Sequence, residues 1–321
     1  MLPEDAAIIR DLFEQISALG PETRAVYSTM LSELRRRRFA ALCETPSAEA
    51  ERIAAQLVTD GMVDLGVLLD PAKVAEMRAH FASRPVYDGH EFTNSDGVAY
   101  DFATLRERAH YGTYSSEDVA RSPHLIEIAN DARLLQIAEA YLGCPPTIYH
   151  LNAWWSFARG TPAIKAQALH RDVEELRFVT LFIYLTPVGE RNGPHRFIRH
   201  SHDKDVLTRM LAGLGWSQDV LETHVPPMFH GQAYQPTPAT EELLAPLATV
   251  WQGPAGSAIL ADTYGFHMGV PVIEGERLML WIRYGIGHST ACFSPGYGAI
   301  LRPRIPQTPR ARYVNRLLLM E

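Results

Sequence analysis

The chain has 321 residues, of which 46% are hydrophobic and 21% are charged, so it can bury a sizeable core as one large domain or two small ones. Its formal net charge of -7 gives no electrostatic footprint for nucleic-acid binding. No apolar run approaches the about 20 residues needed to cross a bilayer, and the acidic start Met1–Asp5 is unlike a secretion signal. Three widely separated cysteines, Cys43, Cys144 and Cys292, argue against a disulfide framework. We therefore expect a cytoplasmic protein without a membrane span.

The first part of the chain is predicted to be helical. Apolar residues recur at helical spacing over Ala6–Phe39, with a break at Gly20–Pro21, and we assign residues 1–54 to a helical N-terminal extension. The basic run Arg35–Arg38 is expected to form a solvated helix face or a contact with an acidic protein surface, and we infer no nucleic-acid binding from it.

Strands dominate the second half of the chain. A short strand is predicted at Val63–Leu69 between helices, a helix over Leu125–Leu142, and a strand over Thr147–Phe157, which is rich in β-branched and aromatic residues. The prolines at Pro226–Pro227 and over Pro236–Pro246 mark a long irregular insertion, about residues 203–250. An insertion of this kind could lie over a barrel mouth as a lid.

The segment His170-Arg171-Asp172 is the first candidate for chemistry. No other histidine in the chain has an acidic residue two positions later, and a strand-like run, Arg177–Leu185, follows directly. Residues i and i+2 of an extended segment point to the same face, so His170 and Asp172 can face one side while Arg171 faces the other. Two histidines and one carboxylate form the facial triad of non-haem Fe(II) oxygenases. The pair therefore predicts two of the three iron ligands.

The third candidate ligand is His267, which follows an apolar, strand-like segment that begins at Gly256. A turn at Glu274–Glu276 separates His267 from a second strand pattern, Arg277–Tyr284. We expect a hairpin that returns Arg277 towards His267. A guanidinium there could hold the distal carboxylate of 2-oxoglutarate through a bidentate pair, for which arginine is better suited than lysine.

Over roughly Ala55 to Tyr284, the chain resembles the phytanoyl-CoA dioxygenase family of Fe(II)/2-oxoglutarate oxygenases, and in particular a bacterial branch whose members often have no assigned substrate. It departs from the family at Arg171, where members commonly have glutamine, and at Gly269, where they commonly have serine. The motifs that carry the resemblance are His170-x-Asp172, Asn192-Gly193-Pro194-His195 with Ser201-His202, and His267 with Arg277.

The resemblance implies an α+β fold built on a double-stranded β-helix, a cupin-like jelly-roll core with N-terminal helices and an inserted lid. On this basis we assign residues 55–290 to the oxygenase domain, with the insertion at about 203–250 inside it. Residues 291–321 are assigned to a C-terminal tail that packs on this domain.

The resemblance also implies that His170, Asp172 and His267 are the catalytic, iron-binding residues and that Arg277 binds 2-oxoglutarate. Dioxygen is the oxidant, and ascorbate could serve as a reductant. The predicted reaction hydroxylates an aliphatic C–H bond of a small-molecule, lipid or glycan-type substrate and releases succinate and CO2. Hydroxylation is favoured over halogenation because Asp172 is present, whereas related halogenases have a small residue there. Further candidates for cosubstrate contacts, each of which could instead be ordinary barrel lining, are Asn152, Trp154, Thr180 and Tyr184.

Two other functions stay open. A jelly-roll metalloenzyme without 2-oxoglutarate is disfavoured by the position of Arg277 after His267. A non-catalytic binding protein is disfavoured because two imidazoles and a carboxylate that converge without a metal are electrostatically awkward. The sequence specifies neither the substrate nor the oligomeric state.

Four further residues have two interpretations each. His195, His200 and His202 could form a zinc cluster, but we interpret them as turn residues, because no cysteine accompanies them. Arg283 lies six residues after Arg277 and so shares its face in a strand, which makes it a secondary candidate for binding substrate or cosubstrate charge.

Overall fold

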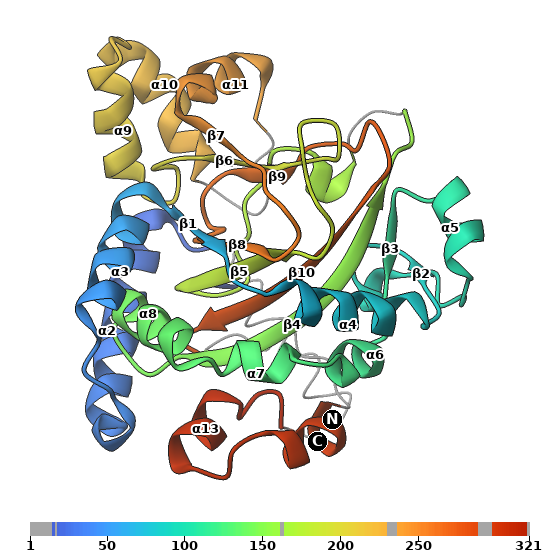
Figure 1. Ribbon diagram of the computed structural model, residues 1–321. Coiled ribbons are helices and arrows are strands. Elements are labelled where there is room, and N and C mark those ends of the chain that lie inside the picture. Colours follow the sequence, from blue (N-terminus) through green and yellow to red (C-terminus); the bar gives the residue numbers. More distant parts are fainter. Residues whose placement is uncertain (1–14, 17, 161–163, 230–235, 288–296, 320–321) are drawn as a thin grey trace.

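Two antiparallel sheets form the centre of the computed structural model, which describes residues 15–16, 18–160, 164–229, 236–287 and 297–319 (Figure 1). The large sheet has the strand order β1-β8-β5-β10-β4-β3-β2, and the small sheet has the order β7-β6-β9. The strands of the large sheet are β1 (Met62–Val67), β2 (Tyr87–Asp88), β3 (Tyr111–Thr113), β4 (Thr147–Phe157), β5 (Phe178–Tyr184), β8 (Ser257–Ala261) and β10 (Glu276–Gly285). Those of the small sheet are β6 (His195–Ile198), β7 (Ala248–Trp251) and β9 (His267–Gly269).

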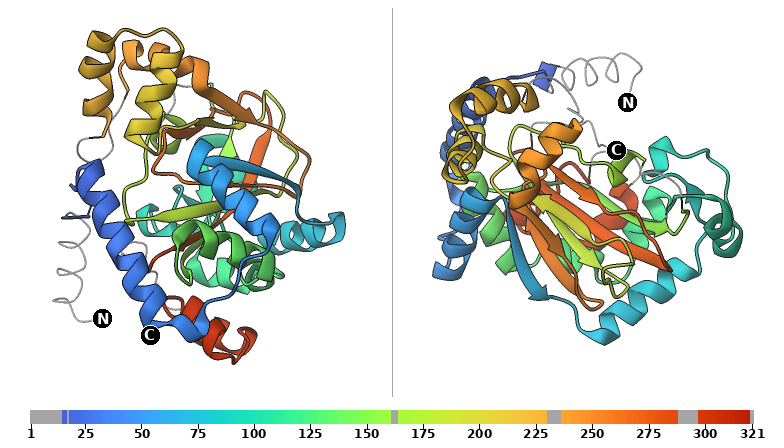
Figure 2. Two further views of the ribbon diagram at one scale, coloured as in Figure 1. Left: turned by 90° about the vertical axis from the view of Figure 1, so that its left-hand side faces the viewer. Right: turned by 90° about the horizontal axis from the view of Figure 1, so that it is seen from above.

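Helices cover the outer face of the large sheet, so the described chain forms three layers (Figures 1 and 2). Among the residues of this outer core, Leu57 and Phe81 come from helices, and Leu181 and Leu280 come from the sheet. The mixed helix and sheet content and the jelly-roll core confirm the predicted α+β fold. The helices before β4 are α2 (Pro21–Arg38), α3 (Ala48–Asp60), α4 (Pro71–Ala82), α5 (Phe102–Arg108), α6 (Ser116–Arg121), α7 (Leu125–Ala129) and α8 (Ala132–Leu142). After β10 come α12 (Tyr297–Leu301) and α13 (Pro309–Val314).

The inner face of the large sheet points towards the small sheet and forms the barrel interior. Side chains of an extended strand alternate between faces, so Leu278 and Leu280 of β10 enter the outer core while Met279 and Trp281 enter the interior. Phe197 of the small sheet belongs to the same inner cluster. This alternation also places the two arginines of β10, residues 277 and 283, on the inner face, as the sequence predicts.

The predicted hairpin between His267 and Arg277 is wrong. Strand β9 pairs with β6 in the small sheet, whereas β10 pairs with β4 and β5 in the large sheet. The segment between them therefore crosses from one sheet to the other. The turn signal at Glu274–Glu276 is real, since Gly275 has a φ of 73°, but a turn signal does not specify the strand with which the next strand pairs.

In its described residues, the insertion between β6 and β7 is largely helical, not irregular. The α-helices described there are α9 (Lys204–Gly213), α10 (Gln218–Met228) and α11 (Pro238–Leu244), and Figure 2 shows them gathered at one end of the molecule. Pro226 and Pro227 lie inside the last turn of α10. Their presence in the sequence had indicated irregular structure there. The role of this insertion as a lid stays a prediction.

The remaining helix predictions differ in detail from the structure. The helix predicted over Leu125–Leu142 is two helices, because Asp131 accepts a hydrogen bond from the backbone amide of Leu134 and so caps the start of α8. Gly143 ends α8 with a φ of 75°, as predicted. The first half of the helix predicted from Ala6 lies mostly outside the described residues, and α2 begins at Pro21, the second residue of the predicted break. No helix within the described ranges is long and apolar enough to cross a membrane.

Replacing Gly61 by alanine should lower the free energy of unfolding more than replacing Gly66. Both residues have positive φ, 79° and 70°, so alanine costs about 1–2 kcal/mol at either position. At Gly61 the added Cβ would also lie 2.6 Å from His202 Nδ1 and 2.9 Å from Phe197, whereas nothing lies within 4 Å at Gly66. We expect a further loss of about 1–3 kcal/mol at Gly61, measured by urea denaturation. Equal losses in the two variants would contradict the described packing.

Candidate active site

A pair of backbone hydrogen bonds brings the two candidate histidine ligands together. The amide of His170 donates to the carbonyl of His267 at 3.0 Å, and the amide of His267 donates to the carbonyl of His170 at 2.9 Å. Residues that exchange both bonds lie directly opposite each other, with side chains on the same face. The two imidazole rings accordingly lie side by side, with centroids 4.3 Å apart.

Each of these imidazoles is oriented by a nearby carbonyl. His170 Nδ1 lies 2.8 Å from the carbonyl oxygen of Ala168, and His267 Nδ1 lies 2.9 Å from that of Gly265. A carbonyl can only accept, so each Nδ1 carries the proton and each Nε2 presents its lone pair. Metal-binding histidines are usually fixed in this way.

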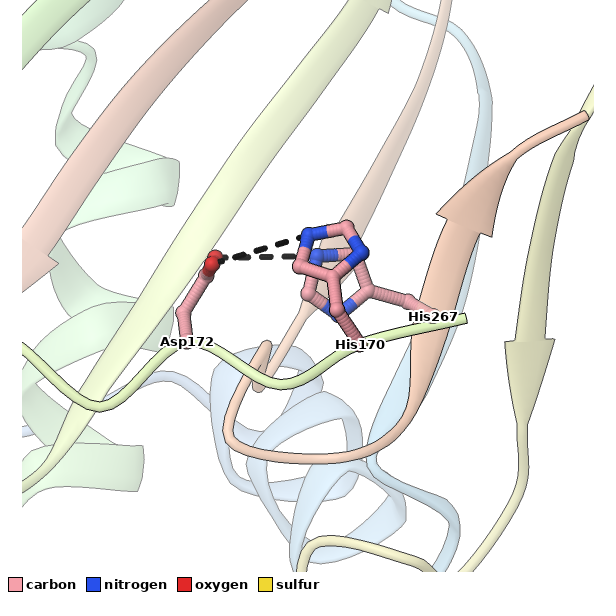
Figure 3. A group of neighbouring side chains, drawn as sticks. All are labelled: His170, Asp172 and His267. Carbon is pink, nitrogen blue, oxygen red and sulfur yellow. Dashed lines mark ion pairs between the residues drawn. The ribbon is translucent and has the colours of Figure 1, made fainter. Parts of the chain in front are cut away.

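Asp172 completes the group (Figure 3). Its carboxylate oxygens lie 3.8 Å from His170 Nε2 and 3.6 Å from His267 Nε2. One ligand atom from each of the three residues lies within 4.8 Å of the others. Because a first-row metal binds N and O ligands at about 2.1 Å, two ligands of one ion lie at most about 4.2 Å apart. The two measured separations from Asp172 therefore fit a single ion.

The loop after β8 and the strand β10 hold Asp172 in place. Its amide donates to the carbonyl of Thr263 at 2.8 Å, and its carboxylate accepts from Arg283 Nη2 at 2.8 Å. Burial raises the pKa of Asp172, but Arg283 and the two imidazoles outweigh burial and lower this pKa to about 2. Burial also lowers the pKa of His267 to about 4, and the neighbouring His170 adds to this effect. An ionised carboxylate and a neutral imidazole are the forms that bind a metal ion.

Arg277 lies on the inner face of the large sheet, as Arg283 does, and is paired with Ser156 where β10 runs beside β4. Its side chain is buried, and its Nη2 donates to Ser156 Oγ at 3.0 Å while its Nη1 donates to the carbonyl of Gly193. Its Nε has no hydrogen-bond partner, and no carboxylate in the described part of the chain pairs with it. Burial lowers the pKa of Arg277. A buried guanidinium without a counter-ion is costly unless an anion joins it, so this position fits a carboxylate ligand.

A comparison of the chain with known protein families identifies the family to which it belongs. The model of the family described as phytanoyl-CoA dioxygenase (PhyH) matches residues 57–271. The chain belongs to the phytanoyl-CoA dioxygenase family. It is therefore an enzyme of the iron- and 2-oxoglutarate-dependent oxygenase type, and its cofactors are Fe(II) and 2-oxoglutarate. No curated protein matches the chain.

Solved structures of similar fold are known. The epimerase SnoN in complex with Fe3+, alpha ketoglutarate and nogalamycin RO is 17% identical with a TM-score of 0.50, and the match covers 74% of this chain and 84% of that one. EctD from S. alaskensis with 2-oxoglutarate and 5-hydroxyectoine is 17% identical with a TM-score of 0.49, covering 76% and 79%. HygX from Streptomyces hygroscopicus with nickel and 2-oxoglutarate is 15% identical with a TM-score of 0.47, covering 75% and 87%. At these identities the likeness concerns the fold alone.

Gly269 is one of the two positions at which this member of the phytanoyl-CoA dioxygenase family departs from the common pattern. A Cβ added at Gly269 would lie 2.6 Å from Arg277 Nη2 and 3.2 Å from Arg277 Nη1. The absence of a side chain at this position therefore leaves room for the guanidinium where it lies.

The four other candidates for cosubstrate contacts all lie on strands of the large sheet. The side-chain amide of Asn152 donates a hydrogen bond to the carbonyl of His90 and accepts one from the backbone amide of Ala153. Thr180 Oγ1 lies 3.2 Å from Thr263 Oγ1. Tyr184 accepts from the amide of His195 at 2.9 Å and donates to the carbonyl of Trp251 at 3.0 Å. Trp154, unlike the other three, has a buried donor that finds no partner within the described part of the chain. Cosubstrate binding by these four residues stays a prediction.

Near the candidate metal centre, sequence reasoning missed the partners of one residue and the strand position of another. Arg283 lies on the predicted face and pairs with Asp172 and Glu174, and its binding of substrate or cosubstrate charge stays a prediction. His195, expected in a turn, lies in β6 with its ring 5.6 Å from that of His267, and its Nε2 has no partner among the residues that the structure describes. Burial lowers the pKa of His195 well below the usual range. The alternation of His195 with Phe197 was the available signal that it faces inward.

The other two histidines of that predicted turn do lie in turn structure. His200 has a φ of 69°, and its Nδ1 lies 2.7 Å from the carbonyl oxygen of Thr59. His202 Nε2 lies 3.0 Å from the carbonyl oxygen of Val58. Both rings therefore fix the turn to the end of α3, in agreement with their interpretation as turn residues.

Without metal, the protein should lose stability as the pH falls from 7 to 5, and His150 should account for part of the loss. Burial, with a smaller contribution from Arg283, lowers the pKa of His150 to about 3. Below pH 6.5 the unfolded chain binds a proton at this residue that the folded chain does not bind, so acid favours unfolding. Between pH 7 and 5 the difference amounts to about 2 kcal/mol. The substitution His150→Phe should remove this contribution to the free energy of unfolding, as measured by urea denaturation at several pH values. If the free energy of unfolding depended on pH equally in the variant and the wild type, His150 would not be a buried, neutral imidazole.

Proposed function

We propose that this enzyme hydroxylates an aliphatic C–H bond of a small-molecule, lipid or glycan-type substrate, and that it uses Fe(II), 2-oxoglutarate and dioxygen. The observation that carries the proposal is the buried Arg277, which has no carboxylate partner in the described residues and lies against Gly269 of β9, the strand that carries His267. A cation of this kind favours a bound anion, and the distal carboxylate of 2-oxoglutarate is one.

His170, Asp172 and His267 are the proposed ligands of iron. The two Nε2 atoms provide neutral donors, and Asp172 provides one negative charge, so the donor set fits a divalent metal that keeps other positions free. Arg283 donates to Asp172 Oδ2, the oxygen that also lies nearest His267, and keeps the carboxylate ionised. When bound, iron with 2-oxoglutarate supplies the oxidation of a C–H bond by dioxygen, with succinate and CO2 as coproducts.

Arg277 is the proposed anchor for 2-oxoglutarate. Its guanidinium is held from two sides, by Ser156 and by the carbonyl of Gly193, so its orientation is fixed before the cosubstrate binds. A preorganised cation in a site of low polarity binds an anion more strongly than a mobile surface cation does. The residue therefore orients the cosubstrate relative to the three proposed ligands.

The wall of the interior supports a substrate with apolar or ring-shaped parts. Trp154 and Trp281 meet edge to face with centroids 4.8 Å apart, and Phe182 lies 6.1 Å from Trp281. The third proposed protein ligand is the carboxylate of Asp172, so we propose hydroxylation and not halogenation. The proposal includes a cytoplasmic location, where a reducing medium keeps iron ferrous, and ascorbate as a supporting reductant.

Arg277→Lys should raise the Michaelis constant for 2-oxoglutarate about 10- to 100-fold, because an ammonium cannot reproduce the two parallel hydrogen bonds of a guanidinium. Succinate release in the presence of Fe(II) provides the measurement. Arg191→Lys is the matched control, since Arg191 is exposed and pairs with Glu274. An unchanged Michaelis constant in Arg277→Lys would reject the anchor, and iron-dependent activity without any need for 2-oxoglutarate would favour a different class of metalloenzyme.

Product analysis tests the hydroxylation itself. With a substrate found by screening for succinate release, isotopically labelled dioxygen should place one oxygen atom in succinate and one in the product. His267→Ala should abolish both, because two remaining ligands hold the metal weakly. A product that has changed without gaining an oxygen atom would point to epimerisation, cyclisation or desaturation by the same site.

A further inference from the structure

Arg171 lies between two proposed metal ligands, yet its side chain points away from them. It is 6% exposed, and its neighbours His170 and Asp172 face the candidate metal centre. Arg171 is also the second position at which the chain departs from the common family pattern. A buried arginine needs several hydrogen-bond acceptors to offset its desolvation. The acceptors of Arg171 therefore show which parts of the protein it connects.

The guanidinium of Arg171 joins two segments that are far apart in sequence. Its Nε donates to the carbonyl of Tyr264 at 2.8 Å, and its Nη1 donates to the carbonyl of Met228 at 2.6 Å. Its central carbon also lies 3.8 Å from the ring centroid of Tyr264 and 4.5 Å from that of Phe229. Tyr264 belongs to the turn that leads to His267, whereas Met228 is the last residue of α10 in the insertion.

Apolar packing connects the same two regions. Leu169 and Phe266, which directly precede the two proposed histidine ligands, are buried in one cluster with residues of the insertion helices. The members of this cluster that come from α9, α10 and α11 are Leu207, Leu211, Leu221, Val225, Met228, Leu243 and Leu244. A shift of α10 would therefore act on the segments that carry both histidines, because close-packed cores transmit displacement.

We propose that Arg171 is a positioning residue that couples the insertion helices α9, α10 and α11 to the metal-binding group. The inference rests on the proposed function, because it takes His170, Asp172 and His267 as metal ligands. With Arg171 fixed by the two carbonyls, the insertion and the turn before His267 occupy one mutual arrangement. Coupling of this kind is reciprocal, so metal binding stabilises the insertion to the same extent that the ordered insertion strengthens metal binding.

Glutamine is the informative substitution at this position. Its side chain is shorter than that of arginine, can reach only one of the two carbonyls and has no guanidinium plane to stack on Tyr264. Arg24 provides a matched control, because its guanidinium carbon lies 4.3 Å from the centroid of the same ring. Arg24 is equally buried, but its hydrogen bonds go to the carbonyls of Ile16 and Val173, outside the insertion.

Hydrogen exchange of α10 with and without Ni(II), a metal that does not turn over, tests the coupling in the full chain. In the wild type, saturating Ni(II) should slow the exchange of the α10 amides several-fold. Arg171→Gln should abolish this protection and weaken Ni(II) binding about tenfold, the lower end of the effect of residues that orient metal ligands. Arg24→Gln should keep the protection, and its Ni(II) affinity should change less.

The outcomes separate this inference from the proposed function. If the wild type binds Ni(II) but α10 exchanges at the same rate with and without metal, the coupling is rejected while the metal site stands. Protection that persists in Arg171→Gln also rejects it. If that variant does not fold, Arg171→Lys, which keeps the charge but cannot bridge both carbonyls, should show the same loss. A wild type that binds no divalent metal rejects the proposed function, and the coupling with it.

Discussion

The two backbone hydrogen bonds between His170 and His267 are the contact on which the candidate active site depends. They join the segment before β5 to the start of β9, and so place two imidazoles from distant parts of the sequence side by side. Asp172 then reaches the same face because it follows His170 by two residues in an extended segment. A separate bond from its amide to the carbonyl of Thr263 holds Asp172 against the loop after β8. Loss of the pairing would separate all three groups at once.

The electrostatics of the site follow from a single strand. Strand β10 presents Arg277 and Arg283 on its inner face, and the protein treats the two cations differently. Arg283 forms ion pairs with Asp172 and Glu174, so its charge is balanced by residues of the protein itself. Among the described residues, the partners of Arg277 are a neutral hydroxyl and a carbonyl. A buried cation without a counter-ion favours a bound anion, so this difference between the two arginines supports the proposed binding of 2-oxoglutarate by Arg277.

Much of the site was predictable because its signals are local. The spacing of His170 and Asp172 and the strand pattern after them depend only on neighbouring residues, and the strand predicted over Thr147–Phe157 has the bounds of β4. The fold also follows from such patterns once a family resemblance supplies the order of the strands. Long-range pairing is different. The turn before Arg277 gave no information on whether β10 pairs with β9 or with β4 and β5, so the expected hairpin was wrong.

Sequence reasoning missed features that depend on contacts between distant parts of the chain. Arg283 could be assigned to one face, but its two carboxylate partners come from the segment after His170 and could not be deduced from spacing. His195 follows the turn residue Gly193, and the turn signal concealed the strand that begins at His195. Pro226 and Pro227 suggested irregular structure, but a helix tolerates them within α10.

The most direct test of the account is an anaerobic titration of the purified protein with Fe(II) and then 2-oxoglutarate, followed by visible spectroscopy. A metal-to-ligand charge-transfer band should appear in the wild type, weaken in Arg277→Ala, which loses the anchor, and vanish in His267→Ala, which loses a ligand. These three results together would establish both the metal group and the role of the buried arginine. Iron-loaded wild-type protein that gives no band would contradict the central claim, because 2-oxoglutarate would then not bind at the metal.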